Sequence, residues 1–345
     1  METYRGIDHV KAAFKRTFTD RVPVYPICGI VTANLFGAST VKYLQDPDVF
    51  ADCQLKLYEK FKPDVVVMMA DLLMEAEAMG TELKFPEGQI CRIHRHILDH
   101  DKNLDKLTLP DPERDGRMPY YLEACGKITR EVQDSAIGGV ISGPWTIAFE
   151  LREAKNIILD TFRDPDYIHE LMSLTTELVK RFGLEIHSRG VGLSLSEAPA
   201  SCSLISPDIY RNFIKPYHSE LVAFFKEHRI GLTLHICGKI EPIITDVLET
   251  GAAAVSFDAL TPMEKMTELS AGRTVLIGNV ATELFTDPDL NKIEGAVKKC
   301  IDIAAGGSAF ILSSGCEIPP NTGMENIERF MQTAHTYGCY AGSGK

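Results

Sequence analysis

Three residues of this chain have the side chains and the spacing of a zinc site: His235, Cys237 and Cys316. His235 and Cys237 are two residues apart in a β-type run, so both side chains leave the same face of the predicted strand. A zinc ion takes Cys sulfur and His nitrogen at about 2.0 to 2.3 Å in a tetrahedron, and a catalytic zinc keeps one position open. Cys316 is the best third ligand, because it follows the last predicted strand and Gly315 before it allows close backbone approach. The spacing alone also allows a structural zinc.

The elements that must position these residues follow a repeating pattern. Short β-branched or apolar runs alternate with longer amphipathic segments, as in βα units. The eight strand-like runs are residues 22–28, 64–69, 138–142, 191–196, 231–237, 252–257, 274–280 and 308–314, and the main helical segments are 48–61, 120–133, 165–182, 207–228, 240–249 and 289–305. Eight strands with helices between them predict an α/β protein with a (β/α)8 TIM barrel, in a single domain of residues 1–345. No G-x-G-x-x-G or P-loop is present, which disfavours a nucleotide-binding sheet.

One stretch, around residues 82–117, departs from this repeat. Residues 91–97 alternate with period two, and residues 99–117 are polar and punctuated by prolines. We therefore predict a hairpin and loop inserted between barrel units. This stretch also holds a competing set of metal-type ligands, Cys91, His94, His96 and His100. Because that set lies away from the strand ends, we favour the site of His235, Cys237 and Cys316.

Polar residues close several of the predicted strands, and a barrel of this type builds its site from the carboxyl ends of its strands. Asp71 and Glu77 follow the second run, Glu197 the fourth, Asp258 the sixth and Asn279 the seventh. Asp71 lies between apolar residues on both sides, a setting in which a carboxylate needs a partner. Glu75 and Glu77 can also be read as the solvated start of a helix.

Composition narrows the classes of function. The chain has 345 residues, 45% of them hydrophobic, with 36 Lys and Arg against 48 Asp and Glu. The net charge of -12 disfavours a nucleic-acid partner or an anionic membrane. The first residues lack a signal-peptide pattern and no apolar run reaches about 18 residues, so we expect a cytoplasmic protein. Nine cysteines without regular spacing then predict mostly reduced thiols.

Over nearly its whole length the sequence resembles the uroporphyrinogen decarboxylase superfamily, and in particular its zinc-containing methyltransferases that serve corrinoid proteins. The landmarks are D-R-V-P-V at 20–24, A-D-L-L-M-E-A-E-A-M-G at 70–80, G-P-W-T at 143–146 and G-N-V at 278–280. The decarboxylases of this superfamily have a pattern similar to P-V-W-x-M-R-Q-A-G-R at the first strand, and its arginines bind the acidic side chains of a tetrapyrrole. Here Cys28 and Thr32 occupy both arginine positions, so the bidentate pairs are lost. The methyltransferase pattern, H-x-C followed much later by Cys, is present instead.

This resemblance implies a uroporphyrinogen-decarboxylase-like barrel that binds Zn²⁺ through His235, Cys237 and Cys316 and transfers a methyl group. Zinc would deprotonate a thiol acceptor or act as a Lewis acid on a methyl donor. The chain lacks the D-x-H-x-x-G pattern of a cobalamin-binding module, so a separate corrinoid protein is implied. The residues expected to line the substrate cavity are Asp71, Glu77, Glu197, Asp258 and Asn279.

The sequence leaves the substrate and the direction of transfer open. Thiols such as coenzyme M or homocysteine suit a zinc site as acceptors, and methoxylated compounds, methanol or methylamines suit it as donors. The acidic residues at the strand ends slightly favour a neutral or cationic donor over a sulfonate thiol. Two other readings remain: a tetrapyrrole decarboxylase whose arginines have moved, and a non-catalytic accessory barrel with structural zinc. Self-association into a homo-oligomer is also left open.

Overall fold

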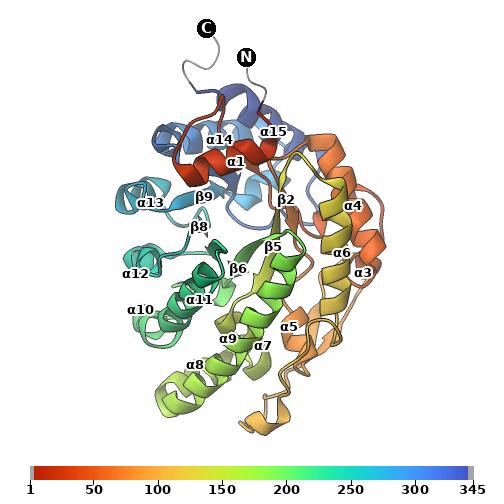
Figure 1. Cartoon of the computed structure of the whole chain (residues 1–345), viewed down its shortest axis with the longest axis vertical. Helices are drawn as coiled ribbons and strands as arrows, with labels where there is room; N and C mark the ends of the chain where they lie inside the picture. The colour runs from red at the N-terminus through yellow and green to blue at the C-terminus, as the bar shows by residue number, and fades with distance from the viewer. Residues whose placement is uncertain (1–3, 341–345) are drawn as a thin grey trace.

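The computed structural model describes residues 4–340 and is built around eight parallel strands (Figure 1). These strands are β1 (Val24–Tyr25), β2 (Val65–Met68), β5 (Ala136–Ser142), β6 (Gly192–Ser196), β7 (Leu232–Ile236), β8 (Ala254–Phe257), β9 (Val275–Val280) and β10 (Phe310–Ser314). Their order in the sheet is β1-β10-β9-β8-β7-β6-β5-β2. The two end strands also approach each other, because the backbone N–H of Asp64 donates to the carbonyl of Val24 at 3.0 Å. The sheet is therefore a nearly closed barrel, and the predicted (β/α)8 fold is confirmed.

The strand boundaries follow the predicted runs with one marked difference. Each of the eight runs overlaps one observed strand, but the first run, predicted over residues 22–28, shrinks to the two residues of β1. Pro23 and Pro26 flank β1, and neither has an N–H to give to a neighbouring strand. The regular strand pairing of this run is therefore confined to Val24 and Tyr25.

Helices surround the strands (Figure 1). They are α1 (Gly6–Lys15), α2 (Val31–Leu35), α3 (Thr40–Tyr43), α4 (Pro47–Phe61), α5 (Met74–Ala78), α6 (Met118–Glu131), α7 (Pro144–Arg152), α8 (Ala154–Arg163), α9 (Pro165–Ser188), α10 (Pro207–Ile209), α11 (Lys215–Glu227), α12 (Ile244–Glu249), α13 (Met263–Ser270), α14 (Leu290–Ala304) and α15 (Met324–Tyr337). Within residues 4–340, none of them combines the length and apolar character that crossing a bilayer requires.

Two helical segments differ from the predicted ranges for local reasons. The segment predicted over 207–228 is split into α10, a π-helical turn at Tyr210–Ile214, and α11. Pro216 lies at the start of α11 and lacks the N–H that a continuous helix would use there. The helix α9 runs past its predicted end at Phe182 to Ser188, and Gly183 within it leaves room for Phe225, since a Cβ at Gly183 would lie 2.5 Å from that ring.

The hydrophobic core has two parts, one between the strands and the helices and one inside the barrel. The inner part contains Val65, Val67, Val140, Ile277 and Ile311, all buried. Barrels of this type usually fill their interior with layers of branched side chains. Here the wall formed by β5, β6 and β7 carries small inward residues instead, which are Gly138, Gly192, Ser194, Gly231 and Thr233. These small residues leave free space along the barrel axis.

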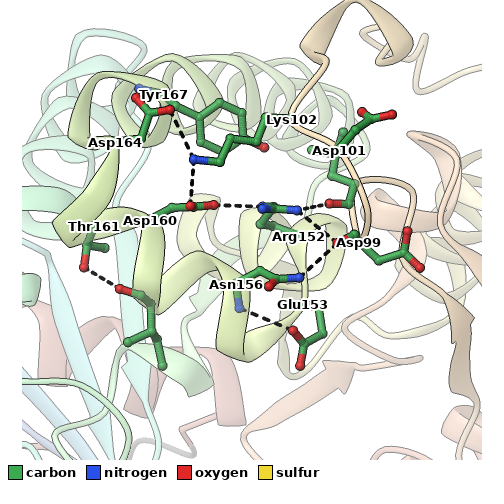
Figure 2. Close-up of polar contacts among 12 residues, drawn as sticks. Asp99, Asp101, Lys102, Arg152, Glu153, Asn156, Asp160, Thr161, Asp164 and Tyr167 are labelled. Carbon is green, nitrogen blue, oxygen red and sulfur yellow. Dashed lines mark hydrogen bonds and ion pairs between the residues drawn. The ribbon is translucent and has the colours of Figure 1, made fainter.

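The segment after β2 contains the antiparallel strands β3 (Glu82–Lys84) and β4 (Arg92–Arg95) and a 3-10 turn at Leu104–Lys106. A polar network fastens the later part of this segment to the helices beside it (Figure 2). The buried Arg152 of α7 donates through Nε to Asp160 at 2.9 Å and through Nη1 to the carbonyl of Asp99 at 3.2 Å. From the segment itself, Lys102 Nζ lies 2.7 Å from Asp160. One carboxylate thus ties the segment to α7 and α8.

Candidate metal centre

The structure brings His235, Cys237 and Cys316 together at the carboxyl end of the barrel. His235 Nε2 lies 3.1 Å from Cys237 Sγ, and Cys237 Sγ lies 3.1 Å from Cys316 Sγ, although the two cysteines are 79 residues apart. The three donor atoms are all within 4.8 Å of one another. Within residues 4–340 this is the one group of three or more His, Cys, Asp or Glu side chains close enough to share an ion. We refer to these three residues as the triad.

Local backbone geometry explains why the triad can form. His235 lies in β7, and Cys237 follows one residue after the strand ends, so both side chains point inward at the same rim. Gly238 then turns the chain with φ of 65°, and a Cβ there would lie 2.6 Å from Ser201 Oγ. At Gly315 a Cβ would lie 2.9 Å from the backbone nitrogen of Ala259. Both glycines therefore permit the close contacts between loops that surround the thiols.

Ser256 fixes the imidazole of His235. Its Oγ lies 2.8 Å from His235 Nδ1, and the two residues are partners in the register of β7 and β8. With Nδ1–H donating to this hydroxyl, the lone pair of Nε2 faces the two sulfurs. Metal-bound histidines are usually oriented in this way through their second nitrogen.

The two thiols share their protons. The hydrogen bond from Cys237 lowers the pKa of Cys316 well below the usual value of a thiol. The same sulfur–sulfur hydrogen bond, together with burial, raises the pKa of Cys237. The pair therefore loses its first proton easily and holds the second, and a thiolate is the form that binds a metal.

A cavity of about 170 Å³ opens directly onto the triad, and we call it the chamber. Besides the triad it is lined by Tyr25, Ile27, Met69, Leu72, Val140, Ser194, Ser196, Ala198, Ser256 and Glu317. One nitrogen and two sulfur donors suit zinc, and three protein ligands beside an open space match a catalytic zinc site better than a closed structural one. The residues present therefore fit a zinc ion with one exchangeable position.

Comparison with known proteins gives the family. The sequence profile described as uroporphyrinogen decarboxylase (URO-D) matches residues 6–337. This chain belongs to the uroporphyrinogen decarboxylase family. The family resemblance inferred from the landmarks at 20–24, 70–80, 143–146 and 278–280 is therefore confirmed.

Within the URO-D family, relatives of both branches are found. The methylcobamide:CoM methyltransferase MtaA of Methanosarcina barkeri is 28% identical over 341 residues, which cover 94% of this chain and 96% of that protein. The uroporphyrinogen decarboxylase of Xylella fastidiosa is 27% identical, covering 87% of this chain and 88% of that protein. Among solved structures, a methyltransferase from Methanosarcina mazei superposes with a TM-score of 0.87 at 25% identity, covering 96% of this chain and 99% of that one.

The five residues predicted to bind substrate lie outside the chamber lining. Asp71 has the partner that its apolar setting requires: Arg117, whose Nη1 lies 2.5 Å from Asp71 Oδ2. The same guanidinium donates through Nε to Glu77 at 2.5 Å. The reading of Glu75 as the solvated start of a helix is wrong, because Glu75 is only 1% exposed and accepts a hydrogen bond from the backbone N–H of Ser142 at 2.9 Å.

Glu197 is fully buried behind the rim of the barrel. Its carboxylate accepts from the backbone N–H groups of Trp145 and Thr146 at 3.1 and 2.8 Å, and it lies 3.1 Å from His218 Nε2. Gly143 makes room for it, since a Cβ there would lie 2.1 Å from the Glu197 carboxyl carbon. These contacts join the end of β6 to the start of α7 and to α11.

Asp258 and Asn279 shape the loop after β8. Asp258 Oδ1 accepts from the N–H of Leu260 at 2.9 Å, and Asn279 donates to the carbonyls of Asp258 and Thr261 at 3.2 and 2.9 Å. This loop packs against Gly315 next to the triad. A role for Asp71, Glu77, Glu197, Asp258 or Asn279 in substrate binding stays a prediction.

The competing set of ligands does not converge in the described part of the chain. Cys91 is buried, whereas His94 and His100 are exposed, and His96 Nδ1 lies 2.8 Å from the carbonyl of Glu150. Its side chains are spread along the hairpin and the turn that follows it.

Sequence reasoning identified only the triad among the residues that line the chamber, and it missed Tyr25, Ser256 and Glu317 among others. Glu317 directly follows Cys316, accepts from the N–H of Ile30 at 2.9 Å, and has its pKa raised to about 8 by burial. Its position next to a ligand could have marked it. Ser256 could have been found from the period of two in β8, which turns it inward.

Proposed function

We propose that this chain is a zinc-dependent methyltransferase that moves a methyl group between the cobalt of a separate corrinoid protein and a substrate atom held at the triad. The observation that carries the proposal is the placement of three zinc-type ligands around the mouth of an apolar chamber. Near full-length similarity to two methyltransferases, one from Methanosarcina barkeri and one from Methanosarcina mazei, supports the same activity.

The chemistry divides between the ion and the chain. A bound zinc would supply a positive charge that stabilises a substrate thiolate or polarises the oxygen of a methyl donor. The chain supplies His235, Cys237 and Cys316 as ligands, and Ser256 keeps the imidazole in the right tautomer. The apolar side chains of the chamber keep water away from the reacting atom.

The cobalt would come from a partner. The sequence contains no D-x-H-x-x-G pattern of a cobalamin-binding module. The triad lies at the carboxyl rim of the barrel, which is where a corrinoid protein would have to dock to bring its cobalt near the substrate.

The two other readings fit less well. A tetrapyrrole with several carboxylates needs cationic partners, whereas Cys28 and Thr32 are fully buried and the chamber lining contains no Lys or Arg. A chamber of about 170 Å³ is also small for a tetrapyrrole. A structural zinc normally has four protein ligands, and the group found within residues 4–340 has three.

Metal content and methyl transfer test the proposal together. We expect the purified protein to hold about one equivalent of zinc and His235→Ala and Cys316→Ala to lose it, while Cys339→Ala, which alters an exposed thiol outside the triad, retains it. The zinc form should then methylate or demethylate reduced cobalamin with at least one compound from a panel of thiols and methylated donors. Zinc bound by four protein ligands with no exchangeable position, seen by X-ray absorption, would rule the activity out.

A further inference from the structure

Apart from an ion held by the triad, the chamber offers no positive charge to a substrate. Its lining contains neither Lys nor Arg, and Glu317 is its one carboxylate. Whether protonated or ionised, this residue supplies no cation. An anion moved into such an apolar space without a cationic partner would lose its hydration at a high free-energy cost.

Two cations lie near chamber-lining residues, but neither of them lines the chamber. Arg117 is bound by Asp71 and Glu77 through short ion pairs. Lys239 follows Cys237 by two residues, but it is exposed and does not line the chamber. A sulfonate in the chamber would therefore lack the charge-assisted hydrogen bonds that usually bind such groups.

The chamber has the size and surface of a site for a small ring. Ile27, Met69, Leu72 and Val140 contribute apolar side chains around it. Its volume of about 170 Å³ is close to that of a cavity of about 150 Å³ that binds benzene. Tyr25 and Ser194 close its floor, because both also line a second apolar cavity of about 170 Å³ toward the other end of the barrel.

We propose that the chamber binds an uncharged methyl compound whose apolar body is about the size of a benzene ring, with phenyl methyl ether as the simplest example. It would discriminate against anionic thiols such as 2-mercaptoethanesulfonate, the coenzyme M in the name of the Methanosarcina barkeri relative. This inference rests on the proposed function, because the bound compound is a substrate only if the protein transfers methyl groups. The binding preference itself is a property of the chamber and can be measured without turnover.

Two matched pairs of probes test the charge preference by calorimetry. Phenyl methyl ether should bind at least tenfold more tightly than 4-methoxybenzoate, which adds one carboxylate to the same body. Ethanethiol should bind the zinc form at least tenfold more tightly than 2-mercaptoethanesulfonate, which has the same thiol and an added sulfonate. A sulfonate thiol that binds more tightly than ethanethiol, with the gain lost in Lys239→Ala, would overturn the proposal.

A pair of variants locates the site. Ala198→Leu adds volume inside the chamber and should weaken binding of phenyl methyl ether at least tenfold, whereas Ala281→Leu, on the same rim but outside the lining, should leave it unchanged. Equal binding by both variants, or no binding by the wild type, would contradict the inference.

Measuring the binding of phenyl methyl ether to the His235→Ala variant separates this inference from the proposed function. A protein that binds the ether without zinc but never transfers a methyl group would refute the activity and leave the chamber's preference standing. If the protein binds zinc, transfers methyl groups and accepts sulfonate thiols, the proposed function stands and the chamber's preference is refuted.

Discussion

Ser256 Oγ lies 2.8 Å from His235 Nδ1, across the paired strands β8 and β7. The imidazole is thus oriented by a hydroxyl of the barrel wall itself. A ligand held in this way loses less conformational freedom when it coordinates an ion.

Removing this hydroxyl should weaken zinc binding. We expect Ser256→Ala to lower zinc affinity by about 10- to 100-fold, as is typical when the hydrogen-bond partner of a metal-bound histidine is lost. Competition with a chromogenic chelator would measure it. Ser194→Ala, which alters another hydroxyl of the chamber that does not contact His235, serves as the control. Equal affinities in both variants would show that Ser256 does not orient the ligand.

Arg117 holds two carboxylates that are partly or largely buried. Arg117→Met should lower the free energy of unfolding by about 3 to 5 kcal/mol, because Asp71 and Glu77 would remain without their counter-charge. Urea denaturation followed by circular dichroism would measure the loss. Arg114→Met, at an exposed position on the same segment, should change the stability by no more than about 0.5 kcal/mol. A loss below 1 kcal/mol for Arg117→Met would mean that, without the arginine, the two carboxylates become hydrated or protonated and need no counter-charge.

Glu75 is predicted to be protonated in the folded protein. Ser142 Oγ lies 2.9 Å from both the carbonyl of Leu72 and Glu75 Oε2. The single hydroxyl hydrogen can serve only one of these oxygens, so a protonated carboxyl that donates to Ser142 Oγ satisfies both contacts. Burial raises the pKa of Glu75 to about 7, in agreement with this geometry.

The sign of the pH effect follows from that raised pKa. The folded state holds a proton that the unfolded chain releases above about pH 4.5, so this contribution is complete below pH 4.5 and is lost as the pH rises through about 7. Glu75→Gln keeps the same hydrogen bonds without a titrating proton. Its stability relative to the wild type should therefore rise by about 2 to 3 kcal/mol between pH 4.5 and 8. A constant difference across this range, measured by denaturation, would show that Glu75 is ionised when folded.

Tyr25 separates the chamber from the second cavity. Tyr25→Ala should join the two spaces and allow a two-ring ligand such as 2-methoxynaphthalene to bind at least tenfold more tightly than it binds the wild type. Tyr25→Phe keeps the ring and should behave like the wild type, which also controls for loss of the hydroxyl. Calorimetry and a thermal melt of each variant would separate binding from misfolding. If both variants bind the larger ligand equally, the aromatic ring does not form the floor.

The sequence by itself determined the strands and the candidate ligands. Runs of β-branched residues at βα spacing predicted eight strands, and a parallel barrel gathers the ends of its strands at one rim. His235 and Cys237 share a face because side chains in a strand repeat every two residues. These features depend on local periodicity, so they are readable without coordinates.

The tertiary structure alone decided which polar residues face the chamber. Glu197 and Asn279 lie at the ends of their strands as predicted. Their side chains, however, form hydrogen bonds with backbone N–H and carbonyl groups of neighbouring segments. Arg117 neutralises Asp71 from 46 residues away, a distance that no local pattern reports. Which partner a buried polar group contacts depends on how segments distant in the sequence pack together. For that reason the sequence could place the triad, while only the folded chain shows that the chamber beside it is lined by no Lys or Arg.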